Sequence, residues 1–384
     1  MILTHSDAII LTMKEKKNEI KYALAVLASG CLWGTMGYFR RHLGEMGIDT
    51  FGVVFVRCIF AAILYALFAL IRNPSVLKIR LKDAWCFLGS GIVSLLFFSA
   101  CYFKAMTYMS LSAAAILLYT APCFVMLMSA LLFKEKITYK KLFAMIMAFL
   151  GCCFVSGIGK GESLSATGLL FGLGSGFGYA LYSIFGHYAI GKNYSSLTIS
   201  FWSCLLAGIG AAIICAFTNC LRQCIQITFS SAGNTLFCIT AAFITTFLPY
   251  LLYTFGLTGI EAGAASVIAS IEPVVATIVG IFLYNERLSL FSIIGIALVI
   301  LAIFLLAGNT KEKTARKKTI ADEIPFDPEK QIPVIKCSIC TGEQIAGFKN
   351  IKDGHFTEVM MLKSNNDLNY FKEIYQINDI KKEY

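Results

Sequence analysis

The sequence predicts an all-α polytopic membrane protein: ten transmembrane helices in two inverted five-helix repeats, followed by a small cytoplasmic α+β C-terminal module. Hydrophobic residues make up 57% of the 384 residues, charged residues only 15%, and the mean hydropathy is +0.72. A soluble domain is about 45–50% apolar and about 25% charged. Together with ten apolar stretches and an internal repeat, this composition argues against a soluble enzyme, a secreted domain or a nucleic-acid-binding protein.

Ten stretches are apolar enough to cross a bilayer, which takes about 20 mostly apolar residues. Their apolarity is continuous rather than alternating, so we expect helices and not the strands of a membrane barrel. The fifth and the tenth are the shortest. The stretches are 22–39, 51–71, 84–106, 112–133, 142–157, 167–189, 197–217, 235–257, 262–283 and 291–307.

Basic residues between these stretches predict the orientation. Connecting segments on one side of the membrane hold 13 Lys and Arg residues, and those on the other side hold 5. We therefore expect both termini in the cytoplasm and the chain in the plasma membrane. Of the net charge of +10, residues 1–308 carry +9, from 20 basic and 11 acidic residues. The charge thus indicates membrane orientation, and no nucleic-acid partner is expected.

The chain also repeats itself. Moving residues 102–157 forward by 151 positions aligns Tyr102 with Tyr253 and Pro122 with Pro273. Each repeat holds five helices, an odd number, so the second repeat must insert upside down, as in many secondary transporters. Moving the earlier residues forward by 146 positions aligns Ser29 with Ser175, Gly30 with Gly176, Trp33 with Tyr179, Phe55 with Phe201 and Cys58 with Cys204.

Two segments share one pattern: SAAAILLYTAPCFVMLMSALLFKEKIT at 112–138 and GAASVIASIEPVVATIVGIFLYNERLS at 263–289. Each begins with small residues, has a proline in mid-helix, and ends with an acidic residue beside a base. With ten spans and the duplication, the chain resembles the EamA-type transporters of the drug/metabolite transporter superfamily over about residues 20–308. The expected parts are an N-terminal segment 1–20, repeats 21–157 and 167–308, a linker 309–331 and a module 332–384.

The resemblance implies a carrier of small organic metabolites, often an exporter of amino acids or related compounds, with its cavity between the repeats. No nucleotide-binding motif is present, so we expect a secondary transporter working by alternating access, with no enzymatic activity, cofactor or metal. Its expected partners are a small-molecule substrate, the lipid bilayer and, as a further candidate, a second copy of the chain. The alternative is a membrane-anchored sensor or scaffold whose C-terminal module is the output.

Two charged residues within spans are the first candidates for the binding site, since a charge in the bilayer is costly and must be paired or face a cavity. Glu272 would bind a substrate amine or couple protons; otherwise it is a structural carboxyl bonded to a neighbouring helix. Arg57 would bind a substrate carboxylate, pair with Glu272, or extend to the membrane surface.

Aromatic and proline residues complete the predicted site. Trp33, Tyr119, Tyr179 and Tyr253 would line a cavity through packing and cation–π contacts, although tyrosines near span ends are often interfacial anchors. Pro122 and Pro273 each remove a backbone hydrogen bond in mid-membrane, which indicates either a cavity-lining hinge or a packing kink. Twelve of the 14 cysteines lie in or beside apolar stretches, where a thiol packs as a small hydrophobe.

After Gly308 the composition changes. A basic stretch at 311–318 is suited to anionic headgroups, and residues 332–376 read as three strands and a helix. Cys337 and Cys340 form one CxxC pair, for which structural, redox and metal roles stay open. We assign no function to this module. Met13, followed by Lys-Glu-Lys-Lys, is an alternative start to Met1.

Overall fold

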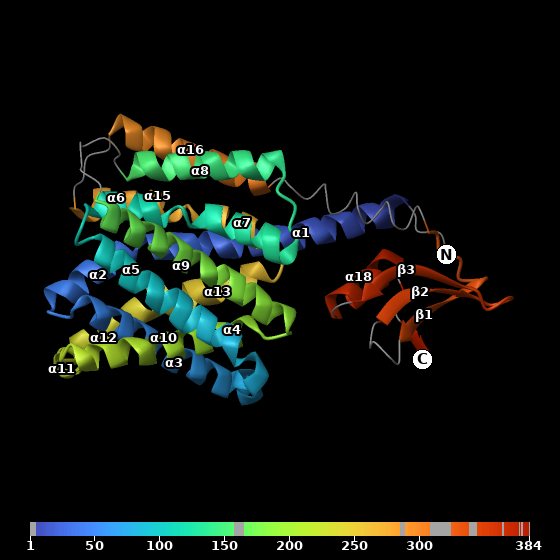
Figure 1. Cartoon of the computed structure of the whole chain (residues 1–384), viewed down its shortest axis with the longest axis horizontal. Helices are drawn as coiled ribbons and strands as arrows, with labels where there is room; N and C mark the ends of the chain where they lie inside the picture. Colours follow the sequence, from blue (N-terminus) through green and yellow to red (C-terminus); the bar gives the residue numbers. More distant parts are fainter. Residues whose placement is uncertain are drawn as a thin grey trace. The chain divides into compact units, whose positions relative to one another are not determined.

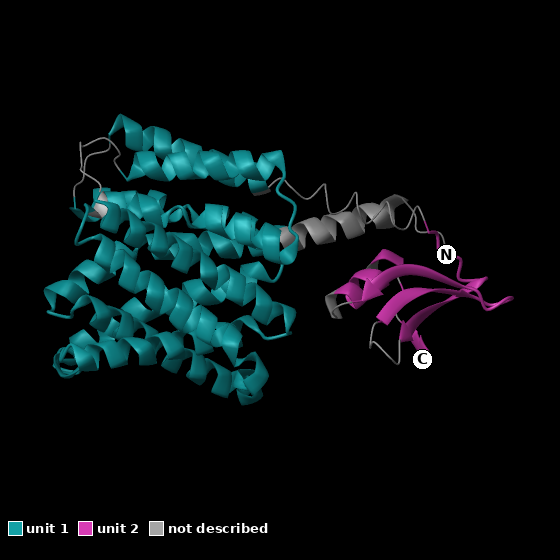
Figure 2. Ribbon diagram, in the orientation of Figure 1, with its two compact units in different colours: residues 1–308 teal, residues 309–384 magenta. Residues whose placement is uncertain are grey.

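The computed structural model describes residues 5–156, 165–284, 289–307, 324–337, 344–362, 365–375, 377 and 379–383. The chain forms two compact units, residues 1–308 and residues 309–384 (Figure 2). The described part of the first unit is entirely helical (Figure 1).

Eight stretches of the described residues form helices long and apolar enough to cross a membrane. Several are assembled from shorter helical segments. They are Ile20–Glu45 (α1 His5–Gly34 and α2 Met36–Glu45), Thr50–Arg72 (α3), Leu81–Ala105 (η2 Leu81–Asp83, α4 Ala84–Leu88, η3 Gly89–Leu96 and α5 Phe97–Ala105), Ala113–Phe133 (α6 Leu111–Leu118 and α7 Ala121–Phe133), Ala166–Gly191 (α9), Ser196–Phe217 (α10), Ala232–Leu257 (α12 Ala232–Ala242, η4 Phe243–Phe247 and α13 Leu248–Leu257) and Ala262–Tyr284 (α14 Ala262–Ala269 and α15 Glu272–Tyr284).

The other two predicted spans form shorter helices. They are α8 (Tyr139–Val155, 17 residues) and α16 (Leu290–Ala307, 18 residues), and they lie side by side (Figure 1). Glycine allows their backbones to approach closely, because a Cβ at Gly151 would lie 2.8 Å from the Gly295 carbonyl oxygen. All ten predicted stretches are therefore helical, eight of them by themselves long enough to span. Short segments η1 (Pro74–Leu77) and α11 (Leu221–Thr228) complete this unit.

Both predicted mid-membrane prolines lie where a helix is interrupted. Pro122 is the second residue of α7, after a break at Tyr119 and Thr120, and Pro273 is the second residue of α15, after a break at Ser270 and Ile271. Proline has no N–H to donate and fits the first turn of a helix. Each proline therefore begins the second half of a broken span.

The second unit is a four-stranded sheet with one helix. Its strands are β1 (Gln331–Cys337), β2 (Gln344–Asn350), β3 (Phe356–Leu362) and β4 (Lys381–Glu383), in the order β3-β2-β1-β4, and its helix is α18 (Asn365–Tyr375). β4 pairs with β1 in parallel, and the other pairs are antiparallel. Phe348 and Phe371 are fully buried at the centre of its core. The three predicted strands and the helix are present, and β4 is an additional strand.

Candidate functional site

A cavity of about 510 Å³ lies inside the helical unit, in the size range of small-molecule sites, about 300–1,000 Å³. A second cavity, of about 600 Å³, shares Gly34, Gly37, Arg40, Val53 and Ala276 with it. The second cavity extends to Arg41, Thr50 and Tyr284, which lie at or near helix ends. The first cavity therefore leads to this end of the bundle, here named the open end.

Arg57 lines the first cavity from α3. Its Nε donates to the Thr246 hydroxyl at 3.0 Å, and its Nη2 donates to the Thr245 carbonyl oxygen at 3.2 Å. Both acceptors belong to η4, a π-helical turn. Arg57 is thus fixed by two hydrogen bonds from a distant segment, while no described carboxylate lies within ion-pair distance of it.

Glu272 lines the same cavity from the first residue of α15. Tyr179 of α9 lines the cavity together with it. Within the described residues, no salt bridge joins Glu272 to a basic side chain. Arg57 and Glu272 therefore present a positive and a negative group to one cavity without neutralising each other by direct contact.

Aromatic rings form one end of the first cavity around Trp33, which is 5% exposed. Its ring centroid lies 5.1 Å from that of Tyr250, 5.4 Å from that of Tyr253 and 6.1 Å from that of Tyr179. Trp33 and Tyr253 also border another, much smaller space of only about 10 Å³. The Tyr253 hydroxyl lies 2.7 Å from the Ser183 hydroxyl. This packing closes the cavity on the side away from the open end.

Polar contacts join two loops at the opposite end of the bundle, here named the closed end. Lys141 forms an ion pair with Glu261 and donates to the Lys136 carbonyl oxygen at 2.8 Å. The Glu135 carboxylate accepts from the Ala262 N–H at 3.3 Å, at the start of α14. A negative group at a helix N-terminus is electrostatically favourable. These contacts connect residues 135–141 with residues 261–262.

The predicted site residues divide into two groups. Trp33, Arg57, Tyr119, Tyr179, Glu272 and Pro273 all line the first cavity. Tyr253 borders the small space beneath Trp33, and Pro122 is buried in the bundle away from the described cavity wall.

Four further residues line the first cavity: Arg40, Tyr102, Thr246 and Tyr250. Tyr102 and Tyr250 belong to the wider set of span aromatics that could line a cavity, although the aromatics deeper in the spans were favoured over them. Arg40 was counted only as a loop charge and was not predicted. Thr246 carried no signal of its own, because a lone threonine in a span is ordinary.

Comparisons with known proteins agree with this architecture. The profile of the EamA-like transporter family matches residues 20–157 and again residues 166–308. An uncharacterized transporter of Archaeoglobus fulgidus is 27% identical, the match covering 73% of this chain and 94% of that protein. The uncharacterized transporter YxxF of Bacillus subtilis is 24% identical, covering 82% of this chain and 98% of that protein.

A solved crystal structure shares the fold, with a TM-score of 0.62 at 16% identity, covering 77% of this chain and 98% of that one. Both of these relatives are named transporters. The chain is thus a multi-pass protein of the lipid bilayer that transports a small-molecule substrate. Two matches to one profile cover most of the sequence, and the chain therefore belongs to the EamA-like transporter family.

Proposed function

We propose that the chain is a secondary transporter of a small zwitterionic metabolite of the amino-acid type, exporting it across the plasma membrane by alternating access. The observation that carries the substrate class is the presence of Arg57 and Glu272, unpaired with each other, in one cavity. A guanidinium binds a carboxylate through directed hydrogen bonds, and a carboxylate binds an ammonium group. The two side chains thus suit the two charged groups of an amino acid.

The aromatic residues suit the rest of such a substrate. Trp33, Tyr119 and Tyr179 line the cavity beside the charged pair. Their rings would pack on an apolar or cationic side chain. Only interactions with both charged groups distinguish a zwitterion from a simple acid or amine.

The two ends of the bundle support alternating access. The cavity leads to the open end, whereas the aromatic packing around Trp33 and the loop contacts of Lys141 and Glu261 occupy the other end. We assign this conformation to the outward-facing state, because Arg40 and Arg41 at the open end belong to the side with fewer basic residues. In the proposed cycle the inverted repeats rock, so that the closed end opens as the open end closes.

The test is transport by the purified full chain in liposomes loaded with a mixture of labelled amino acids and with matched monocarboxylates and monoamines. We expect flux of a subset of amino acids and none of the singly charged analogues. Equal flux of the monocarboxylates would contradict the zwitterion assignment. Absence of any flux, together with a cellular response lost on deletion of residues 309–384, would instead favour the sensor. Unchanged flux after that deletion supports a carrier with an accessory module.

A further inference from the structure

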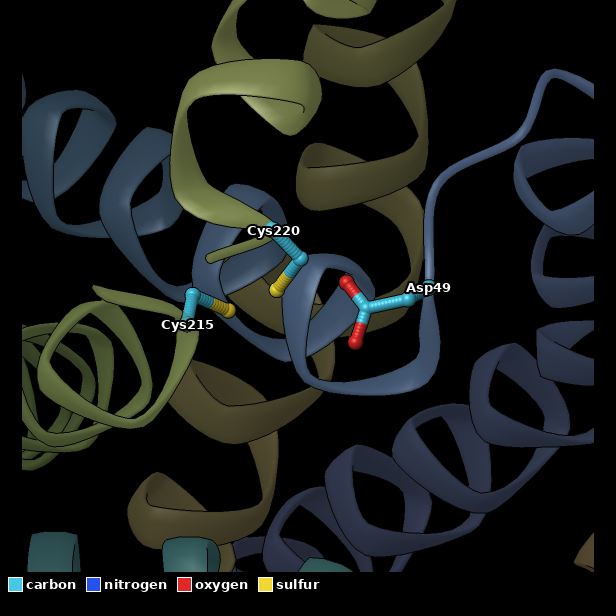
Figure 3. A group of neighbouring side chains, drawn as sticks. All are labelled: Asp49, Cys215 and Cys220. Carbon is cyan, nitrogen blue, oxygen red and sulfur yellow. The ribbon is translucent and has the colours of Figure 1, made fainter. Parts of the chain in front are cut away.

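We propose that Asp49, Cys215 and Cys220 form a zinc site that joins the start of α3 to the end of α10. The three side chains come from two segments more than 160 residues apart, and their carboxylate and sulfur atoms all lie within 4.8 Å of one another. Figure 3 shows both sulfurs and the carboxylate pointing into the same space. Ligand spacing in the sequence predicted no such site.

The end of α10 brings the two cysteines together. Asn219 has a φ of 59°, a left-handed conformation that asparagine tolerates. The Cys220 N–H donates to the Cys215 carbonyl oxygen at 3.0 Å, and the Asn219 N–H donates to the Ala216 carbonyl oxygen at 3.2 Å. This pair of bonds is a Schellman motif, which turns the chain back over the last helical turn. Cys220 is therefore placed beside Cys215.

A Schellman motif often includes an apolar contact between these two positions, and two thiols alone would satisfy it. Asp49 is what distinguishes a ligand set from such a contact, because it directs a carboxylate at the two sulfurs. An anionic oxygen gains only a weak hydrogen bond from a neutral thiol. It gains strongly from a cation bound by the corresponding thiolates.

The chemistry of the three groups favours zinc over other common cations. Thiolate and carboxylate ligands suit Zn²⁺, with Zn–S distances of about 2.3 Å and Zn–O distances of about 2.0–2.2 Å. In a tetrahedral site such ligand atoms lie within about 4 Å of one another. Calcium and magnesium instead require sets of oxygen ligands. Binding would release the two thiol protons and leave the fourth position to water or a further thiol.

Cys224 is a candidate for that position. A Cβ at Gly52 would lie 2.7 Å from the Asp49 carboxylate and 3.1 Å from the Cys224 sulfur, so both groups border the same space. Cys224 is 2% exposed and packs with Leu43 and Ile48, so the buried side of the group is apolar. An apolar surround limits water access to a bound metal and strengthens its electrostatic interactions.

Asp49 also caps α3, accepting from the Gly52 N–H at 3.0 Å and the Phe51 N–H at 3.3 Å. The variant Asp49→Asn separates the two roles, since asparagine is a good N-cap but a poor zinc ligand. Cys220→Ser removes one thiolate at a partly exposed position. Cys31→Ser is the matched control, because Cys31 is also partly exposed and lies on α1, away from the group.

The experiment measures Zn²⁺ binding to the reduced, metal-free full chain in detergent, with Co²⁺ as the spectroscopic substitute. The wild type and Cys31→Ser should bind one equivalent of Zn²⁺ more than Cys220→Ser does. They should also show tetrahedral Co²⁺ bands and a Zn²⁺-dependent rise in melting temperature. Asp49→Asn should weaken this binding by about 10- to 100-fold.

Two results would overturn the proposal. One is the same zinc stoichiometry and Co²⁺ spectrum in the wild type and in Cys220→Ser, provided that both elute as the same monodisperse species. The other is a Cys215–Cys220 disulfide in protein alkylated before cell lysis, detected by peptide mass spectrometry. Because zinc binding is measured without substrate, the test is independent of the proposed transport function.

Discussion

The Arg57 guanidinium donates to the Thr245 carbonyl oxygen, an acceptor that the sequence itself leaves free. In an α-helix this oxygen would accept from the residue four positions later, which is Pro249 and has no N–H. The same stretch of backbone forms the π-helical turn η4, and such turns often occur at functional sites. Arg57 thus satisfies a buried carbonyl group while the guanidinium remains at the cavity wall.

Thr246→Val should weaken substrate binding without unfolding the protein. The valine keeps the shape of the threonine but removes the acceptor of the Arg57 Nε bond. A hydrogen bond to a charged group contributes about 1.5–3 kcal/mol, so the apparent KM for transport should rise about 10- to 100-fold. Thr240→Val is the control, since Thr240 is exposed and bonds to its own helix. A wild-type KM in Thr246→Val would show that Arg57 orientation does not determine affinity.

Glu272→Gln tests the partner for the substrate amine. Glutamine keeps the size of the side chain and its capacity to form hydrogen bonds, but not the charge. Leaving a substrate ammonium without its counter-charge costs about 3–5 kcal/mol, so amino-acid flux should fall more than about 100-fold. A residue that also couples protons would in addition change the pH profile of any remaining flux. Wild-type flux in Glu272→Gln at every pH would exclude both roles.

Two glycines face the backbone that the mid-span prolines interrupt. A Cβ at Gly30 would lie 2.9 Å from the carbonyl oxygen of Ala269, four residues before Pro273. A Cβ at Gly176 would lie 2.7 Å and 3.3 Å from the carbonyl oxygens of Leu117 and Leu118, the latter four residues before Pro122. Gly30 and Gly176 are also aligned by the internal repeat.

Gly30→Ala and Gly176→Ala should therefore be destabilising to a similar degree. Each methyl would meet backbone atoms that cannot rotate away, and such overpacking costs about 1–3 kcal/mol. We expect melting temperatures in detergent to fall by about 2–10 °C. Gly44→Ala serves as the control, because a Cβ there would meet nothing within 4 Å. An effect at only one of the two glycines would contradict a shared role of the repeats.

Local signals were sufficient to predict much of this fold. Continuous apolarity located all ten long helical stretches, and Pro122 and Pro273 marked two interruptions because proline cannot continue the backbone hydrogen bonds. Alternation and turn residues located the strands of the C-terminal sheet. Gly354, with a φ of +72°, lies in the turn before β3.

Contacts between distant residues could not be predicted. Thr246 is 189 positions from Arg57, and neither residue indicates the other. The group of Asp49, Cys215 and Cys220 depends on the end of one helix meeting the start of another. The strand β4 reads Lys-Lys-Glu and has no strand signal; it forms because β1 offers an unpaired edge. Such features depend on packing, which composition and periodicity do not specify.

The closed end should respond to pH through Glu135. Burial, and secondarily the charge of Glu261, raise the pKa of Glu135 above its ordinary 4.5, whereas the Ala262 N–H and Lys141 act in the opposite direction. A carboxyl whose pKa is higher in the closed state favours that state when protonated. This contribution is fully present below pH 4.5 and is lost as the pH rises through the raised pKa.

Opening of the closed end can be measured by hydrogen exchange of peptides covering residues 134–141 and 258–263, with the rates corrected for intrinsic exchange. In the wild type, protection should fall as the pH rises through that window, and Glu135→Gln should remove the dependence because the amide is neutral throughout. Lys141→Gln should lower protection at every pH above this window, because Glu261 loses its ion-pair partner. Glu45→Gln, an exposed carboxylate paired with Arg41 near the open end, is the control. A pH dependence that persists in Glu135→Gln would assign the response to another group.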